Sequence, residues 1–84
     1  MYGVVFSYSF DGDVSIYLKS TLEDAKEFLN ESYEEELRID IEENGWNSEG
    51  FIDENGMYAE IKTYFDDGDD VCDITRFQIG CVYR

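Results

Sequence analysis

The spacing of the apolar residues changes once along this chain, from a period of two to a period of three or four, and then changes back. The segment 2–10 alternates, and residues 14–19 alternate again after a turn at 11–13, so the two segments predict a β-hairpin. Aromatic and β-branched residues, which strands favour, occupy every second position of the first segment: Tyr2, Val4, Phe6, Tyr8 and Phe10.

The longer period predicts a single helix. Ser20-Thr21-Leu22-Glu23 fits a capping box in which Ser20 accepts a hydrogen bond from the backbone N–H of Glu23. Gly45 supplies a C-terminal stop, so a helix of about 22 residues is expected. Residues 37–43 also alternate as a strand would, and helix is the favoured of these two interpretations. The apolar positions of the helix recur every three or four residues: Leu22, Ala25, Leu29, Tyr33, Leu37 and Ile41.

Three more strands are predicted after the helix. Residues 51–54 and 57–65 flank Asn55-Gly56, a pair suited to a type I′ hairpin turn. The segment 71–83 forms the last strand. The order strand, strand, helix, strand, strand, strand favours an α+β fold, in which one antiparallel sheet of about five strands packs one face against the long helix. A chain of 84 residues makes a single domain, 1–84.

The excess of acidic residues limits the partners of this domain. The chain has 21 Asp and Glu against 6 Lys and Arg and no His, a formal net charge of −15, yet 43% of its residues are hydrophobic, enough for a folded core. A negative field attracts basic surfaces and repels nucleic acid and anionic membranes. We therefore expect a basic protein as partner, no direct binding of nucleic acid and no membrane association. No signal peptide or membrane span is indicated, so a cytoplasmic location is expected.

Six acidic residues follow helical spacing on the side of the predicted helix away from its apolar positions, and Arg38 interrupts them. Side chains at i and i+3 or i+4 lie about 5–6 Å apart, close to the spacing of charges along a nucleic-acid strand. The row is either a binding surface for a basic partner or an ordinary solvated helix face. Like charges at this spacing weaken a helix, which favours binding. We call these residues the acidic ridge: Asp24, Glu27, Glu31, Glu34, Glu35 and Glu42.

Two further groups are candidates for partner binding. Tyr17 and Tyr58 lie on the polar sides of their alternating segments and are candidate surface anchors, although aromatic residues in strands more often pack in the core. An Asp-rich turn precedes the last strand, and its spacing does not match an EF-hand loop, so a charged turn is favoured over a metal site. This turn contains Asp66, Asp67, Asp69 and Asp70.

Catalytic chemistry has little support in the sequence. The chain has no His for acid–base or metal work, no Ser or Cys in a recognisable nucleophile motif and no glycine-rich phosphate loop. We therefore expect a protein that is not an enzyme and that holds no cofactor and no metal.

The two cysteines are expected to be free thiols. Cys72 and Cys81 lie nine positions apart in one predicted strand. In an unbulged strand they would point to opposite faces of the sheet and could not form a disulfide.

In size, charge, lack of His and Pro, and acid-lined α+β organisation, the chain resembles the small acidic proteins that phages and mobile elements make against host defence, including DNA mimics and anti-CRISPR proteins. The resemblance is one of overall character, and no motif carries it. It implies stoichiometric inhibition of a nucleic-acid-binding defence protein through its basic cleft. The alternatives are an immunity or antitoxin-like inhibitor of a basic toxin, or an acidic interaction protein of no specialised role. A homodimer formed through an edge strand is compatible with all three.

Overall fold

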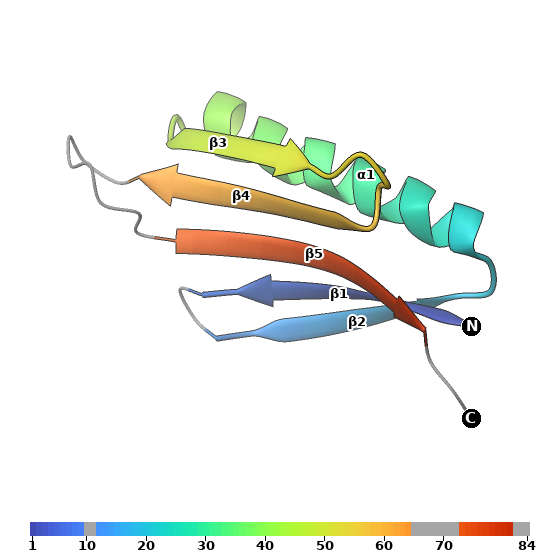
Figure 1. Ribbon diagram of the computed structural model, residues 1–84. Coiled ribbons are helices and arrows are strands. Elements are labelled where there is room, and N and C mark those ends of the chain that lie inside the picture. Colours follow the sequence, from blue (N-terminus) through green and yellow to red (C-terminus); the bar gives the residue numbers. More distant parts are fainter. Residues whose placement is uncertain (10–11, 65–72, 82–84) are drawn as a thin grey trace.

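The computed structural model describes residues 1–9, 12–64 and 73–81. In these ranges five antiparallel strands form one sheet, and one helical segment packs on it. The strand order is β2-β1-β5-β4-β3, so β2 and β3 are the edges of the sheet (Figure 1). The predicted α+β fold is confirmed. The elements are β1 (Tyr2–Tyr8), β2 (Val14–Lys19), α1 (Leu22–Arg38), a π-helical turn η1 (Ile39–Glu43), β3 (Asn47–Ile52), β4 (Tyr58–Tyr64) and β5 (Asp73–Cys81).

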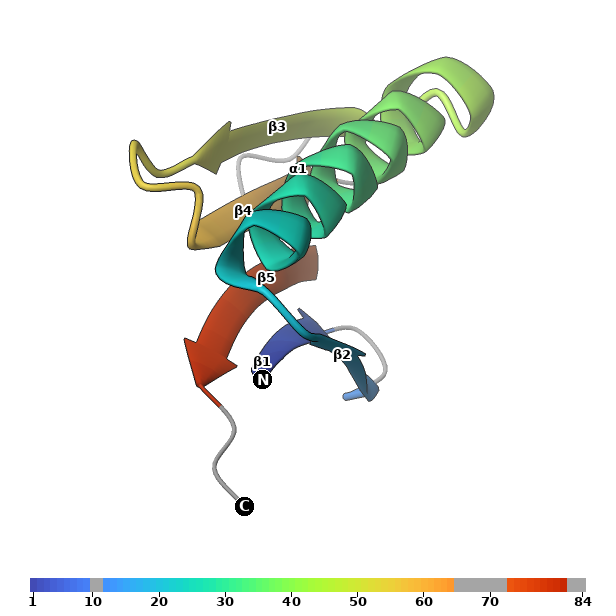
Figure 2. The same cartoon turned by 90° about the vertical axis from the view of Figure 1, so that its right-hand side faces the viewer.

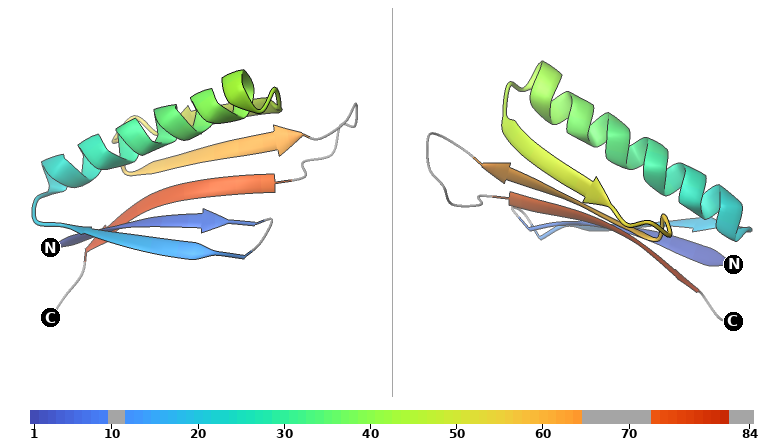
Figure 3. Two further views of the ribbon diagram at one scale, coloured as in Figure 1. Left: turned by 180° about the vertical axis from the view of Figure 1, so that it is seen from behind. Right: turned by 45° about the horizontal axis from the view of Figure 1, so that its top comes forward.

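The last strand, β5, lies in the middle of the sheet and joins the two hairpins. It pairs with β1 on one side, where Phe6 lies opposite Phe77, and with β4 on the other, where Ala59 lies opposite Phe77. Because side chains alternate along a strand, these residues point to one common face of the sheet. The helix covers that face, and none of the described elements covers the other (Figure 3).

The core fills the space between α1 and this face of the sheet. Phe6 links the helix to β5 in this core, because its ring centroid lies 4.8 Å from that of Phe77 and 5.7 Å from that of Phe28. Viewed from its end, the helix lies along the inner side of the curved sheet (Figure 2). The buried hydrophobic residues come from β1, β4, β5 and the helix: Val4, Phe6, Ala25, Leu29, Tyr33, Ala59, Ile61, Phe77 and Ile79.

The helix begins one residue later than the predicted capping box requires. Thr21, not Ser20, is the N-cap: its backbone is extended and its Oγ1 accepts a hydrogen bond from the N–H of Asp24 at 3.1 Å. Ser and Thr are both favourable at this position. The local sequence therefore does not distinguish between the two neighbours.

Residues 37–43 are helical, as predicted, but the last turn is a π-helix. The N–H of Asn44 donates to the carbonyl of Ile39 at 2.9 Å, and Gly45 ends the helix with a φ of 67°. The placement of Ile41 on the apolar stripe is wrong, because Ile41 is 47% exposed and Asp40 is 5% exposed. Asp40 follows Leu29 by about three helical turns, so it returns to the buried side.

The second hairpin is confirmed, with a wider turn than predicted. The carbonyl of Asp53 accepts from the N–H of Gly56 at 3.0 Å, and the Asp53 carboxylate accepts from the N–H of Met57 at 2.9 Å. The turn therefore centres on Glu54 and Asn55 rather than on Asn55-Gly56. An Asp side chain that accepts hydrogen bonds from backbone N–H groups stabilises such a turn. The strand before the turn, β3, is longer than the predicted segment 51–54.

Gly50 in β3 permits a close contact with the helix. A Cβ atom at this position would lie 2.8 Å from the hydroxyl oxygen of Tyr33 and 3.1 Å from the carbonyl oxygen of Glu60. The Tyr33 side chain is buried and its ring packs edge-on against Phe77, with centroids 6.2 Å apart. Tyr33 therefore has little room to move aside.

We predict that Gly50→Ala lowers the free energy of unfolding by about 1–3 kcal/mol, because the added methyl group overpacks the contact with Tyr33. Gly80→Ala is the matched control, since a Cβ there meets no heavy atom within 4 Å. Its effect should stay within about 0.5 kcal/mol. Urea unfolding followed by circular dichroism measures both. Equal stability of the two variants would contradict the proposed steric role of Gly50.

Candidate functional site

The acidic ridge lies on the solvent-facing side of the helical segment. The opposite side buries Ala25, Leu29 and Tyr33 against the sheet, and this fixes the direction in which the ridge points. All six ridge residues are exposed: Asp24, Glu27, Glu31, Glu34, Glu35 and Glu42.

The first four ridge residues are not paired with a Lys or Arg side chain of the described residues. In the described part of the chain, none of Asp24, Glu27, Glu31 and Glu34 forms an ion pair. They span eleven helical residues, or ten steps of about 1.5 Å, which gives about 15 Å and one charge per about 5 Å. One strand of duplex DNA carries a charge about every 3.4 Å of the helix axis. The spacing of this row is thus of the same order as that of phosphates.

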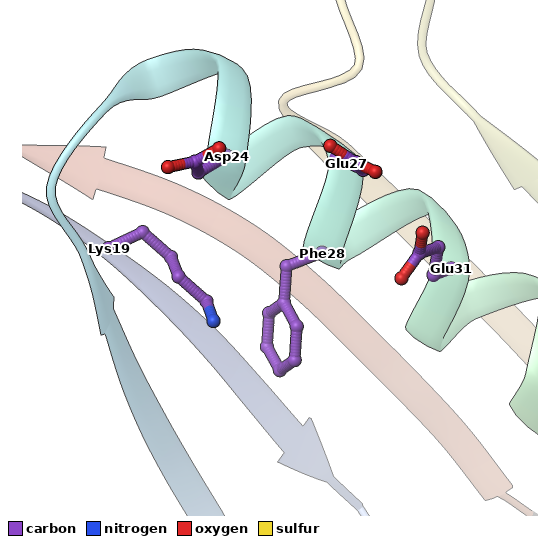
Figure 4. Close-up of a pocket in the computed structure, with 5 residues that line it drawn as sticks. All are labelled: Lys19, Asp24, Glu27, Phe28 and Glu31. Carbon is purple, nitrogen blue, oxygen red and sulfur yellow. The ribbon is translucent and has the colours of Figure 1, made fainter.

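A shallow hollow adjoins the start of the ridge (Figure 4). Asp24, Glu27 and Glu31 line its helix side, and Lys19 and Phe28 lie below them. The Lys19 ammonium is 4.3 Å from the centroid of the Phe28 ring, which is a cation–π distance. The lysine is therefore directed at an aromatic face instead of at the ridge carboxylates.

The end of the ridge is internally compensated by Arg38. Its guanidinium lies 2.6 Å from Glu35, 3.5 Å from Glu42 and 3.8 Å from Glu43. The hydrogen bond and the positive charge of Arg38 lower the pKa of Glu35. The ridge therefore consists of an uncompensated segment, residues 24–34, and a bridged segment, residues 35–43.

The two candidate tyrosine anchors lie on opposite faces of the sheet. Tyr17 points to the helix side, 44% exposed, with its ring centroid 5.1 Å from that of Phe6 and 5.2 Å from that of Phe28. It therefore adjoins the start of the ridge. Tyr58 lies on the uncovered face, where its ring centroid is 6.0 Å from that of Phe51. The structure does not bring Tyr58 together with the ridge.

Part of the predicted site lies outside the described residues. This applies to the acidic turn and to Cys72, so neither the placement of the turn nor the predicted separation of the two cysteines is described. Cys81, at the end of β5, is free and exposed. The turn contains Asp66, Asp67, Asp69 and Asp70.

Two carboxylates on the buried side of the helix were not among the predicted site residues. Burial raises the pKa of Asp40, and Asp73 raises it further, while hydrogen bonds from Thr63 and Ser48 act in the opposite direction. Burial, Asp40 and Asp73 also raise the pKa of Glu36. The signal was present in the spacing, since Glu36 and Asp40 follow Leu29 by about two and three helical turns.

The described residues offer little else for chemistry. No group of three or more acidic or cysteine side chains among them could hold a metal ion. Of the helical segments in the described ranges, none is long and apolar enough to cross a membrane. In comparisons with known proteins, no family model, curated protein or solved structure matches this chain.

We predict that Asp40→Asn increases the stability of the protein more at about pH 7 than at about pH 4. A raised pKa means that the folded state binds the proton more tightly than the unfolded state, so stability falls as pH rises from the ordinary value of 3.8 through the raised pKa. Asparagine removes this penalty and keeps an oxygen that can accept from Thr63 or Ser48. Urea unfolding at about pH 4 and about pH 7 measures the difference between variant and parent.

Glu35→Gln is the control of opposite sign. The pKa of Glu35 is lowered by Arg38, so its contribution is present at neutral pH and is lost as pH falls through the lowered pKa. This variant should lose stability relative to the parent at neutral pH and match it in acid. A change of the same sign for both variants would mean that general charge repulsion, not burial of Asp40, controls the pH dependence.

Proposed function

We propose that the protein is a non-catalytic inhibitor that occupies the basic cleft of a nucleic-acid-binding protein through its acidic ridge. The observation that carries the proposal is the row of four exposed carboxylates on one helix face, none of which forms an ion pair within the described part of the chain. Like charges at this spacing repel each other. Lysine and arginine side chains of a partner would relieve that repulsion.

The scaffold supports this role by holding the row in place before a partner arrives. Ala25 and Leu29 are fully buried and Tyr33 is nearly so, which fixes the helix on the sheet along the length of the uncompensated segment. A preorganised surface loses less conformational freedom on binding than a flexible one. The net charge of −15 adds long-range attraction and faster association with a basic surface.

A host-defence protein is the proposed target, in the manner of the DNA-mimic and anti-CRISPR proteins that the chain resembles in size and charge. The spacing of the uncompensated segment, about 5 Å per charge, supports mimicry of a phosphate row. An inhibitor of a basic toxin would use the same charge without needing that spacing. Competition with nucleic acid therefore distinguishes the two functions.

The test captures proteins on the immobilised chain from a lysate of the cells that encode it. A short DNA duplex should elute the captured protein at constant ionic strength, and prebinding of the chain should abolish duplex binding by that protein. The affinity should fall as salt rises, because the Debye length shortens from about 10 Å at 0.1 M to about 3 Å at 1 M. A ternary complex of chain, target and duplex, or no captured protein, would contradict the proposal.

We predict that the double variant Glu27→Gln, Glu31→Gln binds the captured target at least tenfold more weakly, a loss of about 1.4 kcal/mol. The matched control is Glu49→Gln, Glu54→Gln, which changes the net charge equally but alters exposed residues off the ridge. The control should keep most of the affinity. Equal weakening by both variants would show that only net charge matters, and isothermal titration calorimetry provides the comparison.

A further inference from the structure

The edge strand β2 exposes an apolar stripe on the face of the sheet that the helix does not cover. Val14, Ile16 and Leu18 are 60%, 62% and 55% exposed, more than any other large hydrophobic residue in the described ranges. They alternate with Tyr17, which contacts Phe28 of the helix, so they point the opposite way. The apolar side chains of this strand therefore face solvent, where an edge strand ordinarily has polar side chains.

The backbone of β2 is also available for pairing. Among the described strands it has only β1 as a neighbour, so one row of its N–H and C=O groups faces outward. Edge strands are commonly protected by charges, prolines or bulges. Residues 14–18 carry no charge, and Lys19 is the one charged residue of the strand.

The two edge strands of the sheet differ in charge. The other edge strand, β3, contains Glu49 and is followed directly by Asp53 and Glu54. Two copies of a chain with a net charge of −15 repel each other. They can approach most closely where acids are fewest: β2 itself contains no acid, and Asp13 directly precedes it.

We propose that two copies of the chain associate by antiparallel pairing of β2 with β2, around a two-fold axis at Ile16. In this register Ile16 lies opposite Ile16 of the second copy, and Val14 lies opposite Leu18 of the second copy. Lys19 lies opposite Asp13 of the second copy, which places opposite charges at both ends of the interface. A two-fold interface requires such self-complementarity, and this register provides it in shape and in charge.

The proposed dimer has one continuous ten-stranded sheet, since each copy contributes five strands. Its two-fold axis is perpendicular to the sheet, because the paired strands are antiparallel and share one surface. Both helices then lie on the same face, and the two acidic ridges point in the same direction. The apolar stripes of the two copies become neighbours on the opposite face, beside Val5 of each copy, which lies opposite Ile16 in β1.

The test is sedimentation velocity of the full chain over a range of concentrations and salt. Dimerisation should strengthen as salt rises from about 0.1 to about 1 M, because screening reduces the repulsion between the copies. This salt dependence is opposite to that expected for binding of a basic target, so failure of the dimer and failure of the proposed function are distinguishable. A monomer at every concentration up to about 1 mM would overturn the proposal.

Ile16→Glu should weaken the dimer at least tenfold, because it places two carboxylates against each other at the two-fold axis. The matched control is Phe51→Glu, which introduces the same charge at an exposed apolar residue of the other edge strand. The control should dimerise like the parent. If Phe51→Glu dissociates the dimer and Ile16→Glu does not, the interface lies at β3.

A charge swap tests the register and does not depend on Ile16. Lys19→Asp should weaken the dimer, and adding Asp13→Lys should restore it. Amide hydrogen exchange of the parent provides a second measurement, since the β2 amides that face outward should become protected as the concentration rises. No rescue together with no concentration-dependent protection in β2 would overturn the proposed pairing.

Discussion

The contact between one amphipathic helix and one face of the sheet holds this structure together. Phe6, Phe28 and Phe77 meet there, and Leu29 is fully buried beside them. In the described residues no second layer covers the other face, so most of the apolar area removed from water is in this single interface. The direction of the acidic ridge, the contact of Tyr33 with Gly50 and the exposure of β2 all follow from where the helix lies.

The same contact explains how a chain of this charge can fold. The helix directs most of its carboxylates to solvent, where water and salt reduce their mutual repulsion. Glu36 and Asp40 are the exceptions, and hydrogen bonds with Ser48 and Thr63 partly offset the burial of Asp40. The structure thus tolerates a dense charge on one side of the helix by limiting the acids on the other side.

Much of the fold followed from the sequence because its local patterns are strong. The bounds of β2 and the helical start near Leu22 match the predicted segments, and Gly45 ends the helix as predicted. Tertiary contacts decided the rest. Alternation identified β2 as a strand but did not indicate which of its faces packs on the helix, because that depends on the tertiary contact between Tyr17 and Phe28.

The candidate site was predictable to a similar degree. Helical spacing placed the six ridge residues on one exposed face, and the structure has them there. It did not reveal that Arg38 would bridge Glu35, Glu42 and Glu43, since side-chain rotamers decide which of several neighbouring acids an arginine contacts.

The central position of β5 has a consequence for biosynthesis. Every other described strand is translated before β5, so the hairpins β1–β2 and β3–β4 can form early but remain separate until it emerges. Assembly of the sheet is therefore a late event with long loop closures, and until then the exposed strand edges depend on the high negative charge to resist aggregation.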